Sequence, residues 1–202
     1  MIPFAIAMWK SRLGPRADMI HREAAHVSDI SLSARSALAT VAIPGRHGAA
    51  GTPGVMLAEL RGLALASLAG RGENIGALTA AVEREFGVAL PSRPSRAAQG
   101  TAAFVWSGHN QWLAIGEASG DLVRRLAACA GDLGYVTDLT GSRTIMRISG
   151  PRARDGLMKL LPIDLDEAAF GVGSAASTVA AHMPVHVWQT DEAPAYEIAV
   201  PR

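Results

Sequence analysis

The chain of 202 residues contains one cysteine, Cys129. A single cysteine excludes an internal disulfide and any multi-cysteine zinc or iron–sulfur site, and it suits a reducing cytoplasm. Cys129 falls on the apolar stripe of an expected helix, where a small buried thiol is the ordinary role. We therefore expect no reactive thiol in this protein.

Charge is also scarce, at 18% of residues, and it is balanced, with 19 Lys and Arg against 18 Asp and Glu. A net charge of +1 gives no electrostatic basis for binding nucleic acid or an anionic membrane. Residues 1–9 are apolar, but this run is too short to span a membrane and lacks the basic start of a signal peptide. We therefore expect neither nucleic acid nor a membrane as a partner.

The sequence lacks the motifs of common catalytic sites: a P-loop, a Gly-x-Gly-x-x-Gly fingerprint, a nucleophile elbow and a His-Glu-x-x-His pair. Residues 70–76 are rich in glycine, but no lysine or hydroxyl follows where a nucleotide fingerprint needs one. His182 and His186 lie four residues apart, but Pro184 interrupts them and no third ligand is near. The sequence thus predicts no catalytic, cofactor-binding or metal-binding residue.

Apolar residues, in contrast, make up 49% of the chain, and the mean hydropathy is +0.19. Two interpretations remain open. Abundant alanine raises the average without making a special surface, or part of the exterior is apolar because other subunits cover it. The length fits one domain, or two interlocked small modules, better than two independent domains.

The clearest local pattern is an alternating strand at 143–149, with Thr144, Met146 and Ile148 on one face and Arg143, Ile145, Arg147 and Ser149 on the other. A turn at Gly150 and Pro151 leads into an expected helix over 151–161, which Pro162 ends. Its apolar stripe comprises Ala153, Leu157, Leu160 and Leu161.

The rest of the chain is divided into an N-terminal arm, residues 1–54, and a domain, residues 55–202. The arm is expected to be partly flexible, with a helix near 17–27. The first module of the domain, about 55–140, reads as β-α-β-β-α-β, the ferredoxin-like split βαβ arrangement. Its expected elements are a strand at 55–60, a helix from Asn74 to Gly87, a hairpin of strands 103–106 and 111–115, a helix at 122–133 ended by Gly134, and a strand at 135–139. No strand is assigned to residues 64–71.

The second module, about 141–202, begins a second run of the same order of elements, with the strand at 143–149, the helix at 151–161 and strands at 177–183, 185–189 and 195–200. Pro184 is expected at a turn or an edge. The predicted fold is therefore α+β: two interlocked ferredoxin-like modules with mostly antiparallel sheets.

Asp138, Arg143 and Arg147 form the most informative polar set, since Arg147 shares a strand face with Ser149. That face is open to three interpretations: a buried ion pair or solvated surface, a subunit contact, or an anion site. Trp112 is expected to be a core or interface anchor. These four residues are the candidate subunit-interface or buried ion-pair residues.

Several sequence segments resemble, in their order and spacing, those of the gamma subunit family of heterotetrameric sarcosine oxidase. They are Phe-Gly-Val-Ala-Leu-Pro at 86–91, the hairpin at 105–115, Asp-Leu-Thr-Gly-Ser-Arg-Thr-Ile-Met-Arg-Ile-Ser-Gly-Pro at 138–151, Pro-Ile-Asp-Leu-Asp-Glu at 162–167 and the run 176–188. The resemblance covers about residues 35–202. It implies a fold like the aminomethyltransferase folate-binding domain.

The resemblance further implies a cytoplasmic complex that demethylates sarcosine to glycine, passes the one-carbon unit to tetrahydrofolate and produces hydrogen peroxide. Such a complex carries FAD, FMN, NAD and zinc, none of them on the gamma chain, whose partners are the alpha, beta and delta subunits. We therefore expect a non-catalytic structural subunit. Two alternatives stay open: a stand-alone folate-binding or iron–sulfur maturation protein of the same superfamily, and a gamma-type subunit of a related N-methyl amino acid dehydrogenase.

Overall fold

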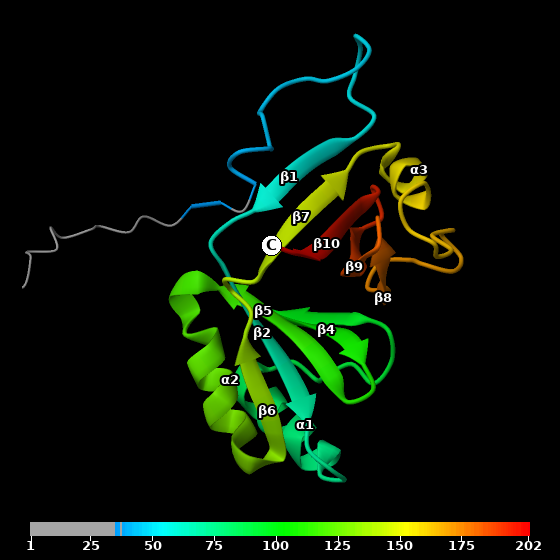
Figure 1. Ribbon diagram of the computed structural model, residues 1–202. Helices are drawn as coiled ribbons and strands as arrows, with labels where there is room; N and C mark the ends of the chain where they lie inside the picture. Colours follow the sequence, from blue (N-terminus) through cyan, green and yellow to red (C-terminus); the bar gives the residue numbers. More distant parts are fainter. Residues whose placement is uncertain (1–34, 37) are drawn as a thin grey trace, which may run out of the picture. The chain divides into compact units, whose positions relative to one another are not determined.

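The computed structural model describes residues 35, 36 and 38–202, of which residues 36–202 form one compact unit (Figure 1). This unit contains two five-stranded sheets in which all neighbouring strands are antiparallel. The predicted α+β fold with mostly antiparallel sheets is confirmed. The helix expected near 17–27 lies outside the described residues, and the division at residue 54 stays a prediction.

The first sheet has the strand order β3-β4-β5-β2-β6. The run β2, α1, β4, β5, α2, β6 follows the split βαβ order, with β3 added at one edge. The bounds are β2 Leu63–Gly70, α1 Ile75–Phe86, β3 Arg96–Gln99, β4 Ala102–Gly108, β5 Gln111–Glu117, α2 Leu122–Ala130 and β6 Gly134–Asp138. The strand that opens this module is β2, at residues where the sequence pattern predicted no strand.

The second sheet has the order β1-β7-β10-β9-β8. Its bounds are β1 Met56–Leu60, β7 Arg143–Ser149, β8 Ala175–Ala180, β9 Met183–Asp191 and β10 Ala195–Pro201, with α3 at Ala153–Met158 between β7 and β8. The strand predicted at 55–60 therefore exists, but it pairs with β7 rather than with the strands of the first module.

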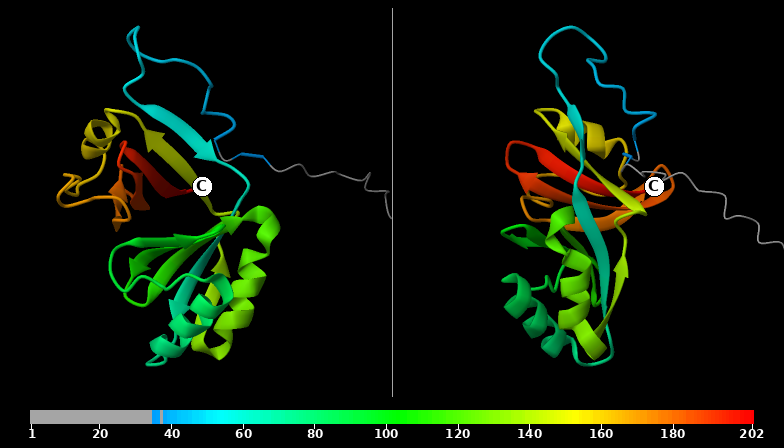
Figure 2. Two further views of the ribbon diagram at one scale, coloured as in Figure 1. Left: turned by 180° about the vertical axis from the view of Figure 1, so that it is seen from behind. Right: turned by 90° about the vertical axis from the view of Figure 1, so that its left-hand side faces the viewer.

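The two sheets share one long extended run of chain, because β1 and β2 are separated only by Arg61 and Gly62. Gly62 has a φ of 70°, a conformation that glycine adopts without steric cost and that redirects the chain from one sheet to the other. Figure 2 shows this run passing from one sheet into the next. The modules are interlocked in this physical sense: a strand that precedes the first module in sequence completes the sheet of the second.

Three apolar clusters divide the unit into layers. One lies between the first sheet and helices α1 and α2, and it includes Leu68, Leu78, Phe104 and Leu126. Another lies between the second sheet and α3 with the segment that follows it, and it includes Leu157 and Tyr196. The third joins residues of both sheets: Leu65, Ala103, Val105, Leu113, Ile115, Ile145, Ala175, Trp188 and Ala199. The sheets therefore pack against each other as well as against helices.

Several predicted boundaries are wrong in detail. The helix expected over 151–161 is only Ala153–Met158 and leaves Leu160 exposed, since Gly156 weakens so short a helix. Asn74 forms no side-chain cap, and α2 ends before Gly131 rather than Gly134. Pro184 lies inside β9, paired with Val179 of β8. The pairing with β10 starts only at His186, so no ladder bond from a Pro184 N–H is needed.

Candidate subunit interface

The four residues singled out from the sequence do not converge on one site. Trp112 is buried on the helix-facing side of the first sheet, and its Nε1 donates a hydrogen bond to the carbonyl oxygen of Pro91 at 2.7 Å. Asp138 is exposed at the end of β6, where its Oδ1 accepts from the backbone N–H of Thr140 at 2.8 Å. Hydrogen bonds from Thr140 lower the pKa of Asp138.

Arg143 and Arg147 lie on the same face of β7, as the alternation predicted, and the structure shows that this face turns toward the first sheet. Arg147 stands directly opposite Glu197 of β10, and Glu197 accepts a hydrogen bond from Nε1 of Trp188 at 2.8 Å. Cross-strand neighbours of opposite charge stabilise a sheet modestly. Neither arginine forms an ion pair with Asp138 in the described part of the chain. A subunit contact at Asp138, Arg143 or Arg147 stays a prediction.

His186 lies near Arg143 on the inter-sheet face of β9. The Nδ1 of His186 and one terminal nitrogen of Arg143 are both buried without a hydrogen-bond partner in the described residues. Burial, reinforced by the positive charge of Arg143, lowers the pKa of His186 to about 4. The imidazole is therefore neutral at pH 7, because charging it is unfavourable in a buried position next to the positive charge of Arg143.

This neutral histidine predicts an acid-sensitive stability. An unfolded histidine takes up a proton below pH 6.5, whereas His186 in the folded chain does so only near pH 4, so stability is lost as the pH falls through this window. We expect the free energy of unfolding to drop by about 2 kcal/mol from this residue between pH 7 and pH 5. Urea titrations at both pH values measure it. His186→Gln should shrink the pH dependence by that amount, and an identical dependence in both proteins would contradict the assignment.

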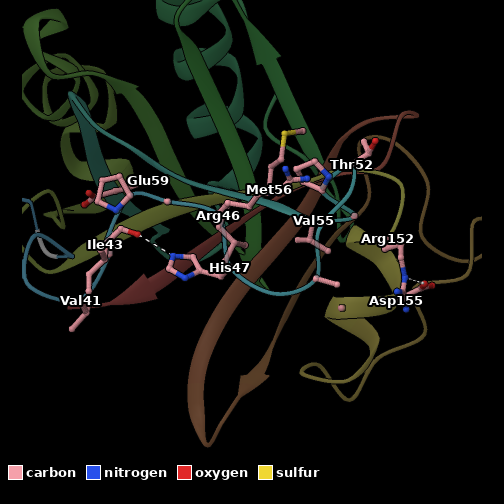
Figure 3. Close-up of a pocket in the computed structure, with 18 of the residues that line it drawn as sticks. Val41, Ile43, Arg46, His47, Thr52, Val55, Met56, Glu59, Arg152 and Asp155 are labelled. Atoms are coloured by element: carbon pink, nitrogen blue, oxygen red, sulfur yellow. Dashed lines mark hydrogen bonds and ion pairs between the residues drawn. The ribbon is translucent and has the colours of Figure 1, made fainter.

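A different surface, at the edge strand β1, has the character of an interface. Met56 and Leu57 are 55% and 67% exposed although they lie within a strand. The segment before β1, residues 38–54, is called the arch here, and it carries Val41 and Ile43 at 70% and 74% exposure. Together with α3, the arch and β1 enclose an open groove of about 1330 Å³, called the β1 groove. Figure 3 shows its lining.

Both ends of the arch are fixed. Before it, Ser36 donates a hydrogen bond to the carboxylate of Glu59, which also accepts from Arg61 at 3.0 Å and Thr144 at 3.2 Å. The bond from Ser36 is the main cause of a lowered pKa at Glu59. At its other end, the carbonyl oxygen of Gly54 accepts from the N–H of Arg152 at 2.9 Å.

Glycine is required at position 150, next to this second anchor. Its φ is 115°, and a Cβ there would lie 2.7 Å from the carbonyl oxygen of Gly54. The backbone of the arch can therefore pass against the start of α3 only because residue 150 has no side chain. The groove is thus held open between two tethered points.

The β1 groove was not predicted from the sequence. The local pattern predicts the strand at 55–60 but cannot place it at a sheet edge, since the partner strand β7 follows more than eighty residues later in the chain. A usable signal was the adjacent pair Met56 and Leu57, because a strand with one buried face alternates whereas this pair places large apolar side chains on both faces.

Cys129 and His182, which were also considered from the sequence, lie on separate elements. Cys129 is half-buried on α2, donates its S–H to the carbonyl oxygen of Leu126, and has a pKa raised by burial. His182 is exposed in the β8–β9 turn, away from the inter-sheet position of His186. Within residues 35, 36 and 38–202, no three His, Cys, Asp or Glu side chains are grouped to hold a metal, and no helix is long and apolar enough to cross a membrane.

Comparison with known proteins decides the relationship of the chain. The family model described as "Sarcosine oxidase, gamma subunit family" matches residues 71–202. The chain belongs to this gamma subunit family. The resemblance read from the sequence is therefore confirmed, and the match includes α1, both strands of the β4–β5 hairpin, and the whole of the chain from β6 onward.

Among proteins of the gamma subunit family, the chain is 40% identical over 117 residues to sarcosine oxidase subunit gamma of an Arthrobacter species, and 38% identical to that of Corynebacterium sp. strain P-1. Each match covers 56% of this chain and 57% of the relative, so the chain spans somewhat more than half the length of these relatives.

One solved structure of a sarcosine oxidase is also similar to the chain. A chain of heterotetrameric sarcosine oxidase from Corynebacterium sp. U-96, in complex with pyrrole 2-carboxylate, matches with a TM-score of 0.65 and 30% identity, over 75% of this chain and 78% of that one. Aminomethyltransferase T of the glycine cleavage system from Bartonella henselae aligns with a TM-score of 0.48 and 13% identity, over 73% of this chain and 42% of that one.

Proposed function

We propose that this chain is a non-catalytic structural subunit of a heterotetrameric sarcosine oxidase. Its family membership and its similarity to a chain of the Corynebacterium complex support this function. The observation that carries the proposal is that a gamma-type fold leaves an edge strand with large apolar side chains open to solvent at Met56 and Leu57. Apolar surface of this kind on a strand edge is typical of a protein that works within an assembly.

In this role the chain contributes rigid packing rather than chemistry. The assembly would oxidise sarcosine to glycine with production of hydrogen peroxide and transfer the one-carbon unit to tetrahydrofolate. FAD, FMN, NAD and zinc would reside on the alpha, beta and delta subunits in the cytoplasm. Holding subunits in a fixed arrangement keeps a reactive intermediate near its acceptor and away from bulk water.

Co-expression tests this function. The tagged chain, produced together with the alpha, beta and delta subunits of its own organism, is expected to co-purify with them in equal amounts as a yellow assembly that oxidises sarcosine. Flavin absorbance and native mass spectrometry give the composition. A chain that stays monomeric and colourless in the presence of all three subunits, but binds reduced folate, would instead support a stand-alone folate protein.

A further inference from the structure

The β1 groove is lined by three elements that leave its interior empty in the described chain: the arch, strand β1 and helix α3 (Figure 3). We propose that an extended segment of another subunit of the oxidase enters this groove, pairs with β1 as an added strand, and carries apolar side chains together with acidic ones. This proposal rests on the proposed function and names the surface through which it acts.

The backbone of β1 is suited to this pairing. The sheet order places β1 at an edge, where it is hydrogen-bonded to β7 on one side only. A strand edge presents unpaired N–H and C=O groups, and an extended peptide satisfies them by adding a strand. Proteins usually protect such edges with an inward charge, a proline or a bulge. The register of β1 with β7 is unbroken from Met56 to Leu60.

The charged residue within β1 does not protect the edge. Glu59 has its side chain engaged by Ser36, Arg61 and Thr144, so its carboxylate is already neutralised and held in place. The end of the strand nearest the arch, Met56 to Ala58, carries no charge. An incoming strand therefore meets no electrostatic barrier along this end.

The side chains around the edge favour an apolar partner. Met56 and Leu57 point to opposite faces of the sheet and both are more than half exposed, so a strand added beside β1 would cover apolar surface on both faces. Val41 and Ile43 line the same groove from the arch. Burial of these four side chains would supply the main driving force, since apolar area removed from water stabilises association.

The rim of the groove sets the charge of the occupant. Its lining includes four cationic side chains, those of Arg46, Arg61, Arg152 and Lys159, against the two carboxylates of Glu59 and Asp155. Both carboxylates are paired, Glu59 with Arg61 at 3.0 Å and Asp155 with Arg152 at 3.3 Å. Arg46 and Lys159 form no ion pair with any described residue. The excess of positive charge at this rim selects an acidic segment.

Most of the β1 groove lies before the region that the gamma subunit family model matches. The arch and β1 precede residue 71, at which the matched region of the gamma subunit family begins, and only α3 lies within that region.

The test uses the full chain co-expressed with the alpha, beta and delta subunits. Leu57→Asp should weaken assembly by about tenfold or more while leaving the fold intact, because the side chain is exposed. Val179→Asp is the matched control, since Val179 is an exposed apolar residue on β8, the opposite edge strand of the same sheet. Titration of the tagged chain against the other subunits measures the dissociation constant, and circular dichroism checks the fold.

Two further measurements distinguish strand addition from non-specific hydrophobic association. Hydrogen–deuterium exchange should show the amides of residues 55–60 protected in the assembly relative to the free chain. Lys159→Glu should weaken assembly, because it replaces an attraction to the acidic partner with a repulsion. The difference in affinity between this variant and wild type should become smaller at high salt, since salt screens both interactions.

Each other outcome overturns the proposal. If Leu57→Asp assembles like wild type and residues 55–60 gain no protection, the surface is wrong while the subunit function stands. If the wild-type chain itself captures no subunit, both fail. If the isolated chain is a dimer that Leu57→Asp dissociates, a second copy of the chain occupies the groove instead.

Discussion

Leu157→Asp should abolish folding of the domain. Leu157 is 2% exposed on α3 and packs against Ile148 and Tyr196 of the second sheet within one apolar cluster. The substitution removes about 2 to 3 kcal/mol of apolar burial and forces a carboxylate into a site with no polar partner, which costs several kcal/mol more. Because domains of this size are stable by only about 5 to 15 kcal/mol, the sum approaches the whole free energy of unfolding.

Thermal melting followed by far-ultraviolet circular dichroism measures this effect, and the expected result is a melting temperature lowered by well over ten degrees or a chain recovered only from the insoluble fraction. Met158→Asp provides the control, since Met158 is the next residue of the same helix and is 54% exposed. It should melt close to wild type. An unchanged melting temperature for Leu157→Asp would show that α3 does not pack as described.

The elements that the sequence predicted well are those whose signal is local. Strand β7 matches its predicted bounds, since alternation over seven residues encodes both its conformation and its two faces. Helix α1 matches as well, with Leu78, Val82 and Phe86 buried along the stripe that their spacing defines and Gly87 just beyond the end. In both elements, the spacing of neighbouring residues is sufficient to predict the conformation and the buried face.

Strand β2 was missed because its residues carry little local signal. It is covered on both faces, by helices on one side and by the second sheet on the other, and so does not alternate between apolar and polar residues. Alanine and glycine occupy four of its eight positions, and both have low strand propensity. Tertiary packing rather than local preference makes this segment a strand.

The candidate interface also has features that local sequence predicts and features that depend on long-range contacts. Alternation in β7 correctly assigned Arg143 and Arg147 to one face. The neighbouring sequence does not predict that this face turns toward another sheet, or that Arg147 lies opposite Glu197 of β10. The β1 groove depends on a contact between β1 and a strand far along the chain, and on Gly150 admitting the backbone of Gly54. Such long-range contacts are set by the fold as a whole and have no signature within a short window.

The second large effect is expected from Trp188→Ala. Trp188 is fully buried in the cluster shared by the two sheets, where Leu65 and Val105 belong to the first sheet and Ile145 to the second. Removing the indole leaves a cavity between the sheets and should cost about 3 to 5 kcal/mol. It also deprives Glu197 of the hydrogen bond from Nε1, adding to the loss. Urea unfolding followed by circular dichroism measures the change.

Trp188→Phe separates the two contributions, because it keeps an aromatic ring between the sheets but removes the Nε1 donor. We expect it to lose markedly less stability than Trp188→Ala. Since the shared cluster is built from both modules, wild-type unfolding should be a single transition, whereas a weakened cluster lets one sheet unfold before the other. Two separated transitions in Trp188→Ala would therefore identify this side chain as the main coupling between the modules. A loss below about 1 kcal/mol would contradict its central place in the packing.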